Sequence, residues 1–199
     1  LRSIEEQVEF LCANLTPKRN HRTLELLAIL LAGVVFPEFE RAAAWRELAL
    51  QETLANVRGN LLPDGVHCEL STDYHHLALR NWLQVRRLAC DNSHGVPREF
   101  DGSLEAALDF SLHVHQPSGM VPSFSDGDVR GFLPLLAQGA ALFDRGDMQY
   151  VASGGREGTP PRERAVHFSS SGYHVVRSDW HSADAQHLVF DCGPLGEGN

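Results

Sequence analysis

The chain has 199 residues, of which 43% are hydrophobic and 22% are charged, as in an ordinary globular protein rather than a disordered one. Its net charge of −9 at pH 7 argues against nucleic acid as the default partner, so an anionic ligand would need a local basic patch. The longest apolar run, Leu24 to Phe36, is interrupted by Glu25 and is too short to span a bilayer.

The four cysteines lie far apart, with neither a CxxC pair nor the spacing of a metal site. We interpret them as small buried residues or free thiols, which indicate no particular redox compartment. The sequence opens on LRSIEEQVEF without a recognisable signal peptide and closes on FDCGPLGEGN. Both ends suggest a fragment, and neither a metal nor a cofactor is predicted from its residues.

Two helices are predicted in the first 35 residues. SIEEQVEFLCANL has the spacing of an amphipathic helix over 3–15, with Ser3 as N-cap and Glu6 completing a capping box. The segment 20–35 is apolar on nearly every side, so we expect a helix that is buried all round.

The sequence KRNHR, residues 18–22, places an amide, an imidazole and three cations at the start of that apolar helix. One interpretation is that Asn20 simply caps the helix, which is a common use of asparagine. The other is that Asn20 and His21 face an anionic ligand, because a helix N-terminus favours negative charge. Arg22 would then add to the attraction for a polyanion.

Four helices are predicted further along the chain. Their segments are EFERAAAWRELALQETLANVRGN, which Gly59 ends, then 72–90, 102–116 and 130–144. LLPDGVHCEL contains a Pro-Asp-Gly turn, and Ser71 or Thr72 is the expected cap of the 72–90 helix. Pro134 lies near the first turn of its helix, where proline is tolerated.

The composition changes near residue 150. SGGREGTPPRER is a linker of glycine, proline and charged residues, and the runs after it alternate with the period of strands. Tyr173, Val175 and Arg177 are expected on one face of such a strand. The predicted organisation is a helical domain over 1–152, a linker over 153–164 and the beginning of a β domain over 165–199.

An all-apolar helix among amphipathic ones indicates an inner and an outer layer of helices, as in a toroid. The ligand cleft of a toroid lies at one end of the inner ring. We therefore expect the KRNH and STDYHH segments at the same end.

Four segments in this order resemble the heparinase II/III-like family of bacterial polysaccharide lyases, including its alginate and oligo-alginate lyase relatives. They are NHRTLELLAILLAGVVFPE, LLPDGVHCELSTDYHHLAL, SFSDGDVRG and HFSSSGYHVVRSDW with HLVFDCGPLGEG. The resemblance runs from about residue 18 to the end. It implies a mainly α fold, the C-terminal part of an (α/α) toroid followed by the first strands of an antiparallel β-sandwich. It also favours a periplasmic or secreted bacterial protein.

The resemblance implies β-elimination at a uronic acid in an anionic polysaccharide or oligosaccharide. A base removes the C5 proton, the C4–O bond breaks, and an unsaturated sugar remains. Because removing that proton builds a second negative charge, a site must neutralise the carboxylate, hold a base and supply an acid to the leaving oxygen.

The resemblance assigns Asn20 and His21 to the uronate carboxylate and Tyr74 to proton transfer. With an ordinary pKa of ~10, Tyr74 needs a cationic neighbour to act as a phenolate, or else it serves as the acid. The alternative is a packed helix tyrosine with a satisfied hydroxyl.

Four residues are predicted to bind substrate: His75, Arg22, Asp126 and Arg177. His75 stands beside Tyr74 in the matching block, and Arg177 lies on a strand that would reach the cleft. The alternatives are that Asp126 and Asp128 cap the helix that follows them, and that Arg177 is an ordinary exposed arginine.

The remaining histidines are predicted to be structural or exposed. His67 is interpreted as structural. His113 and His115 have the spacing of a strand metal pair, but their segment reads as helical, so surface histidines are expected.

The family continues after a turn like GPLGEGN into a block with a histidine that completes the site. That histidine is expected beyond Asn199, so the fragment is predicted to be inactive. Whether the missing sandwich portion holds a structural metal is left undecided by the sequence. Two alternatives keep other functions in view: a toroid glycoside hydrolase with paired carboxylates, and a non-catalytic glycan-binding module.

Overall fold

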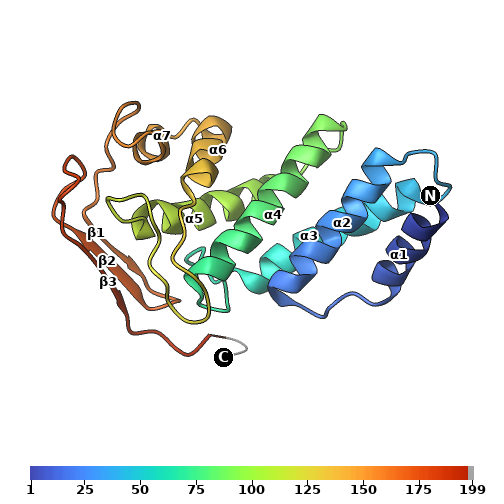
Figure 1. Cartoon of the computed structure of the whole chain (residues 1–199), viewed down its shortest axis with the longest axis horizontal. Coiled ribbons are helices and arrows are strands. Elements are labelled where there is room, and N and C mark those ends of the chain that lie inside the picture. Colours follow the sequence, from blue (N-terminus) through green and yellow to red (C-terminus); the bar gives the residue numbers. More distant parts are fainter. Residues whose placement is uncertain (197–199) are drawn as a thin grey trace. The chain divides into compact units, whose positions relative to one another are not determined.

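The computed structural model describes residues 1–196, and these divide into two compact units. Unit 1 combines Leu1–Asn60 with Leu77–Leu104, and unit 2 combines Leu61–His76 with the chain from Glu105 onward. Figure 1 shows the elements in chain order. The last three residues of the predicted GPLGEGN turn lie outside the described part of the chain.

Residues 1–196 form seven helices and three strands. The elements are α1 (Arg2–Ala13), α2 (Arg19–Val35), α3 (Ala42–Asn60), α4 (Thr72–Asp91), α5 (Arg98–Val114), α6 (Leu133–Phe143), α7 (Gly146–Ala152), β1 (Ala165–Phe168), β2 (Tyr173–Arg177) and β3 (His187–Asp191). All predicted helices are therefore confirmed. The seven-residue α7 was not predicted, because so short a segment carries little periodicity.

Unit 1 is built on the packing of α2 against α1 and α3. Its core consists of apolar side chains from these helices and from α4: Val8, Leu27, Ile29, Leu30, Ala32, Trp45, Ala49 and Val85. The indole N–H of Trp45 donates to Glu9 Oε1 at 2.6 Å, so the one polar atom of this large side chain is satisfied.

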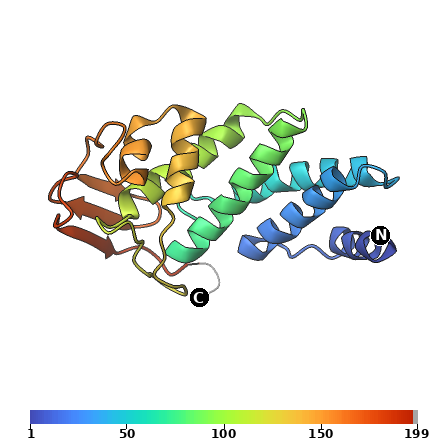
Figure 2. The ribbon, with the colours of Figure 1, turned by 45° about the horizontal axis from the view of Figure 1, so that its top comes forward.

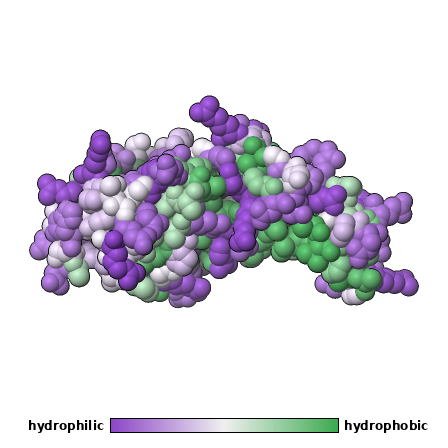
Figure 3. All heavy atoms as spheres, turned by 90° about the horizontal axis from the view of Figure 1, so that it is seen from above, coloured by the Kyte–Doolittle hydropathy of each residue, from purple (hydrophilic) through white to green (hydrophobic). Residues whose placement is uncertain are grey.

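The prediction that α2 is buried all round is wrong for the described residues. Leu24, Leu31 and Val35 are 53%, 39% and 59% exposed, and their spacing places them along one side of the helix. Figure 3 shows that apolar surface is exposed on the face seen from above. Within residues 1–196, no helix is both long and apolar enough to cross a membrane.

The predicted Ser3 cap is wrong, and the alternative that Asn20 caps α2 does not hold either. α1 begins one residue before Ser3, whose hydroxyl accepts a hydrogen bond from the Gln7 side chain instead of capping. α2 begins at Arg19, so Asn20 lies inside the helix. The side-chain oxygen Oδ1 of Asn60 accepts the Arg19 N–H at 3.1 Å, so a residue distant in the sequence satisfies this N–H group at the start of α2.

The sheet of unit 2 is antiparallel, with strand order β1-β2-β3 (Figure 2). Val175 pairs with Val166 on one side and with Val189 on the other. Along β2, Tyr173, Val175 and Arg177 are buried, and this confirms the predicted alternation.

The buried face of the sheet packs on α5 within unit 2. The ring of Phe110 lies 5.1 Å from that of Phe168 and 5.3 Å from that of Tyr173. The Tyr173 hydroxyl donates to the Leu70 carbonyl at 2.6 Å. The strands therefore share a core with α5 and also hold the segment that leads into α4.

The predicted Pro-Asp-Gly turn is confirmed, and its aspartate ties the turn to the β1–β2 hairpin. Asp64 Oδ2 accepts the backbone N–H groups of Ser170 and Ser171 at 2.8 and 2.7 Å. Gly65 has φ +82, and an added Cβ would lie 2.5 Å from the Ala106 backbone. Only glycine fits this close approach.

The predicted linker, 153–164, contains turns without a helix or strand. It is nevertheless held to α7, because the Thr159 N–H donates to the Gly146 carbonyl at 3.0 Å. Within the linker, the Ser153 hydroxyl accepts the N–H groups of Arg156 and Glu157. The predicted boundaries of the helical and β domains stay a prediction.

Four histidines of unit 2 are fully buried: His67, His75, His76 and His115. Burial lowers the pKa of His75 to about 3 and those of His67 and His115 to about 4, and it lowers the pKa of His76 well below its usual value. These rings are therefore neutral at neutral pH. The structural role of His67 fits its burial, whereas the surface position predicted for His115 is wrong.

Hydrogen bonds select the tautomers of two of these rings. His75 Nδ1 accepts the His67 N–H, so its Nε2–H donates to the Ala107 carbonyl at 3.0 Å. His115 Nε2 accepts the Phe132 N–H, so its Nδ1–H donates to the Ser111 carbonyl at 2.6 Å. Protonation would convert an accepting nitrogen into a donor that faces another donor.

We expect mild acid to destabilise unit 2. A histidine whose folded pKa is lowered binds its proton more readily in the unfolded chain, so its contribution is complete above pH ~6.5 and is lost as pH falls toward the folded pKa. Each such ring lowers the free energy of unfolding by up to about 1.4 kcal/mol per pH unit in that window. Urea unfolding at pH 7.0, 6.0 and 5.0 measures this, and an unchanged free energy between pH 7 and 5 would contradict it.

Candidate active site

Tyr74 lies in the first turn of α4, and the residue that caps this helix also contacts a distant loop. Ser71 Oγ accepts the Tyr74 N–H at 3.2 Å, which confirms Ser71 as the cap. The same hydroxyl donates to the Asp126 carbonyl at 2.6 Å. One serine thus joins the start of α4 to the SFSDGDVRG segment.

That segment forms a loop that is closed at its base, where Val121 and Arg130 make an isolated antiparallel bridge. Thr72 holds the near side of the loop, because its hydroxyl donates to the Pro122 carbonyl at 2.6 Å and accepts the Phe124 N–H at 3.1 Å. The loop therefore lies against the first turn of α4 through side chains that the helix start supplies.

Gly127 allows the loop to approach α4 closely. A Cβ added at Gly127 would lie 2.6 Å from Asp73 Cβ and 3.2 Å from Ser71 Oγ. Any other residue here would push the loop outward, and the carboxylate of the preceding Asp126 would move with it.

The side chains of Tyr74 and Asp126 meet across this contact. The phenol O–H donates to Asp126 Oδ2 at 2.6 Å, and Tyr74 is partly exposed. This hydrogen bond is the main cause that raises the pKa of Tyr74, and the carboxylates of Glu69 and Asp73 act in the same direction. Tyr74 is therefore protonated at neutral pH, as a general acid must be.

Two carboxylates near Tyr74, those of Asp73 and Asp128, share the cation Arg130, which was not singled out in the sequence. Its guanidinium lies 2.8 Å from Asp128 Oδ2 and 3.6 Å from the buried Asp73 Oδ1. The alternation of charge in DGDVR is the one signal that could have indicated this pairing.

The prediction that Asp126 and Asp128 cap the following helix is wrong. α6 begins at Leu133 with Phe132 as its N-cap, and no cap side chain makes a hydrogen bond there. The predicted proline in its first turn, Pro134, is confirmed. The Asp126 carboxylate therefore accepts the Tyr74 hydrogen bond instead of capping a helix.

The geometry does not fit a substrate contact for His75. The ring is 0% exposed, and both nitrogens are engaged inside unit 2. It packs edge-on against Phe110 and His76, at 4.8 and 5.1 Å between ring centroids. His75 therefore supports the turn of helix that carries Tyr74.

Asn20, His21 and Arg22 lie at the start of α2 in unit 1. His21 is exposed and Asn20 is half-buried, as groups at a ligand site would be. Arg22 does not fit its predicted substrate contact, because its guanidinium donates to Glu52 Oε2 at 2.5 Å and to the Thr16 carbonyl at 2.6 Å. The Glu52 carboxylate thus already pairs with the positive charge of Arg22.

Arg177 is neither an exposed arginine nor a partner of Tyr74. It is 6% exposed on β2, donates from Nη2 to the His115 carbonyl, and lies 4.0 Å over the ring of Trp180. Burial lowers its pKa to about 10, so it keeps its charge at neutral pH.

The described residues offer no group of three histidine, cysteine or acidic side chains that could hold a metal ion. What this part of the chain does offer is a protonated phenol, held by a carboxylate at the end of a helix. Such a phenol can donate a proton to a leaving oxygen once its O–H turns away from Asp126.

Residues 1–150 match the family described as the heparinase II/III N-terminus. The chain is 26% identical to a heparin-sulfate lyase of Pedobacter heparinus over 99% of its own length and 31% of that protein. It is 28% identical to a heparin-sulfate lyase of Bacteroides stercoris over 88% of its length and 27% of that protein. The chain thus spans about a third of the length of these relatives.

A solved heparinase III structure aligns with 96% of the chain and 31% of its own length, at 28% identity and a TM-score of 0.82. This likeness confirms the predicted fold class, a portion of an (α/α) toroid followed by the first antiparallel strands. Because the family match covers three quarters of the sequence, the chain belongs to the heparinase II/III family.

Proposed function

We propose that this chain is part of a polysaccharide lyase that cleaves a uronic-acid-containing anionic polysaccharide by β-elimination. The observation that carries the proposal is the 2.6 Å hydrogen bond from Tyr74 to Asp126 in a partly exposed helix turn. A general acid must hold its proton at working pH, and this carboxylate raises the pKa of the phenol.

In the proposed reaction, the electrons of the C5–H bond form the C4=C5 double bond while the C4–O bond breaks. Tyr74 gives its proton to the leaving oxygen. Asn20 and His21 neutralise the uronate carboxylate, since the N-terminus of a helix favours an anion. The base at C5 is assigned to the histidine expected beyond Asn199.

Heparin or heparan sulfate is the first substrate to test, because two relatives are named heparin-sulfate lyases. Alginate, hyaluronan and glucuronan oligomers test the wider class of uronates. A periplasmic or secreted location belongs to the same proposal and rests on the family resemblance.

Product analysis separates the lyase from its two rivals. Elimination creates a conjugated double bond that absorbs in the ultraviolet, whereas hydrolysis by paired carboxylates creates new reducing ends without this absorbance. A glycan-binding module would bind the polymer and release no product. The pairing of Asp128 with Arg130 and of Asp126 with Tyr74 disfavours the hydrolase, since a hydrolase needs one carboxyl group kept protonated.

In the full-length protein, Tyr74→Phe should lower the rate of elimination about 10²–10⁴-fold, the usual loss for a missing general acid or base. The ring and its packing remain, so the melting temperature should move little. Ultraviolet absorbance of the product measures the rate. A Tyr74→Phe enzyme with wild-type turnover would remove Tyr74 from the mechanism.

Asp126→Asn should shift the alkaline limb of the pH–rate profile to lower pH. The neutral amide can still accept the phenol hydrogen bond, but it no longer repels the phenolate, so the pKa of Tyr74 falls. An acid loses activity as pH rises through its pKa, and a lower pKa brings this loss at lower pH. Asp128→Asn is the matched control, because Asp128 pairs with Arg130. Equal profiles for all three proteins would refute the assignment.

Asn20→Ala and His21→Ala should each reduce turnover by about 10²–10³-fold, as the loss of an oxyanion-type donor does. Stability should change little, because Asn20 is not the cap of α2 and His21 is exposed. Arg22→Met is the informative contrast: it breaks the ion pair with Glu52 and should lower stability more than turnover. Near-normal turnover in both alanine variants would show that Asn20 and His21 take no part in elimination.

A further inference from the structure

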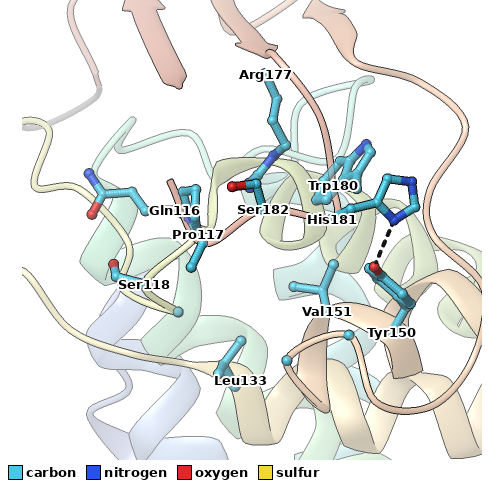
Figure 4. A pocket seen from close by; sticks show the side chains of 14 residues that line it. Gln116, Pro117, Ser118, Leu133, Tyr150, Val151, Arg177, Trp180, His181 and Ser182 are labelled. Carbon is cyan, nitrogen blue, oxygen red and sulfur yellow. Dashed lines mark hydrogen bonds between the residues drawn. The ribbon is translucent and has the colours of Figure 1, made fainter. Parts of the chain in front are cut away.

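A second concave site lies in unit 2, and it shares no residue with the Tyr74–Asp126 pair. It has a volume of about 330 Å³. Its walls come from three segments, residues 116–119 after α5, 150–155 at the end of α7 and 180–183 between β2 and β3, with Leu133 and Arg177 completing them. In Figure 4, Trp180, His181 and Tyr150 gather on one side, and Gln116, Pro117 and Ser118 on the other.

Arg177 reaches this pocket as a buried cation with unused hydrogen-bonding capacity. It is 6% exposed, and one guanidinium nitrogen, Nη2, donates to the His115 carbonyl. Its Nε is buried and has no hydrogen-bond partner. A buried guanidinium with so few hydrogen bonds is costly, and an acceptor placed in the pocket against its terminal nitrogens would offset part of that cost.

Nothing else in the described part of the pocket supplies that acceptor as a carboxylate. Asp179, two residues beyond Arg177, accepts the N–H groups of His181 and Ser182 at 2.8 and 2.7 Å. Its carboxylate therefore stabilises the loop between β2 and β3. The other polar lining groups are hydroxyls, an amide and an imidazole, and the Tyr150 hydroxyl lies 3.1 Å from His181 Nδ1.

We propose that this pocket binds one acidic sugar unit, with its carboxylate or sulfate on Arg177 and its ring among Trp180, Tyr150 and His181. Arginine is suited to such groups because its planar fork presents parallel donors. The volume matches the lower end of small-ligand pockets. The preference for an anion rests on Arg177, whereas the choice of a sugar rests on the proposed function.

Tryptophan fluorescence of the full-length protein is the test, with glucuronate, glucose 6-sulfate and glucose as probes. The three share a pyranose ring, so the first two distinguish a carboxylate from a sulfate ligand and glucose serves as the neutral control. Saturable quenching is expected for at least one acid, with a Kd at least ten-fold lower than for glucose. Trp180→Phe should reduce the quenching, because Trp45 and Trp82, the other tryptophans of these 199 residues, are each only 1% exposed.

Three variants locate the binding. Ala183→Phe, on an exposed loop at the rim, should fill the pocket and raise the Kd at least ten-fold, as should Arg177→Met. Arg162→Met removes an exposed arginine outside the pocket and should change nothing. If Arg177→Met fails to fold, Ala183→Phe decides alone.

Tyr74→Phe distinguishes failure of this proposal from failure of the proposed function. It should lower the rate of elimination about 10²–10⁴-fold and keep the wild-type Kd for the acidic probe. Equal binding of glucose, or a wild-type Kd in Ala183→Phe, overturns the pocket assignment whatever the activity. A protein that binds at the pocket but yields no unsaturated product instead refutes the lyase assignment.

Discussion

The geometry around Tyr74 depends on the hydroxyl of Ser71. It accepts a backbone N–H at the start of α4 and donates to the Asp126 carbonyl, so a single side chain sets both the helix end and the position of the loop. Without this link, the loop would be held to the start of α4 by Thr72 and by the Tyr74–Asp126 hydrogen bond, with no bond to the Asp126 backbone. The close approach at Gly127 makes the arrangement strict, since no side chain fits there.

The first turn of α4 is held from beneath by buried side chains that form hydrogen bonds. His75 and His76 fill the space below it, and Tyr173 secures the Leu70 carbonyl just before the cap. Asp64 fastens the same segment to the β1–β2 hairpin. Buried polar groups that are satisfied in this way specify one arrangement, and half-satisfied ones would not. The sheet therefore contributes to the site by fixing the segment that precedes Tyr74.

Local patterns in the sequence predicted local structure well. The Ser71 cap, the Gly65 turn and the alternation along β2 each follow from the preferences of a few neighbouring residues. What could not be predicted was which distant groups meet. Asp126 lies 52 residues from Tyr74, and its capping preference was the stronger local signal.

The same limit explains the errors at α2 and at His75. Asn60 reaches the start of α2 from the end of another helix, so the expected cap was displaced by a tertiary contact. His75 looked like a site residue because it adjoins Tyr74 in the sequence. Adjacent helix positions point about 100° apart, however, and one side of this turn is core.

The central claim is that Tyr74 and Asp126 act as one unit in proton transfer. A double-mutant cycle on kcat/KM in the full-length protein tests it most directly, with Tyr74→Phe, Asp126→Asn and the double variant assayed on the same uronate substrate. If Asp126 acts through the phenol, the double variant should be no slower than Tyr74→Phe alone. Losses that multiply in the double variant would show that the two residues act independently and would contradict this account.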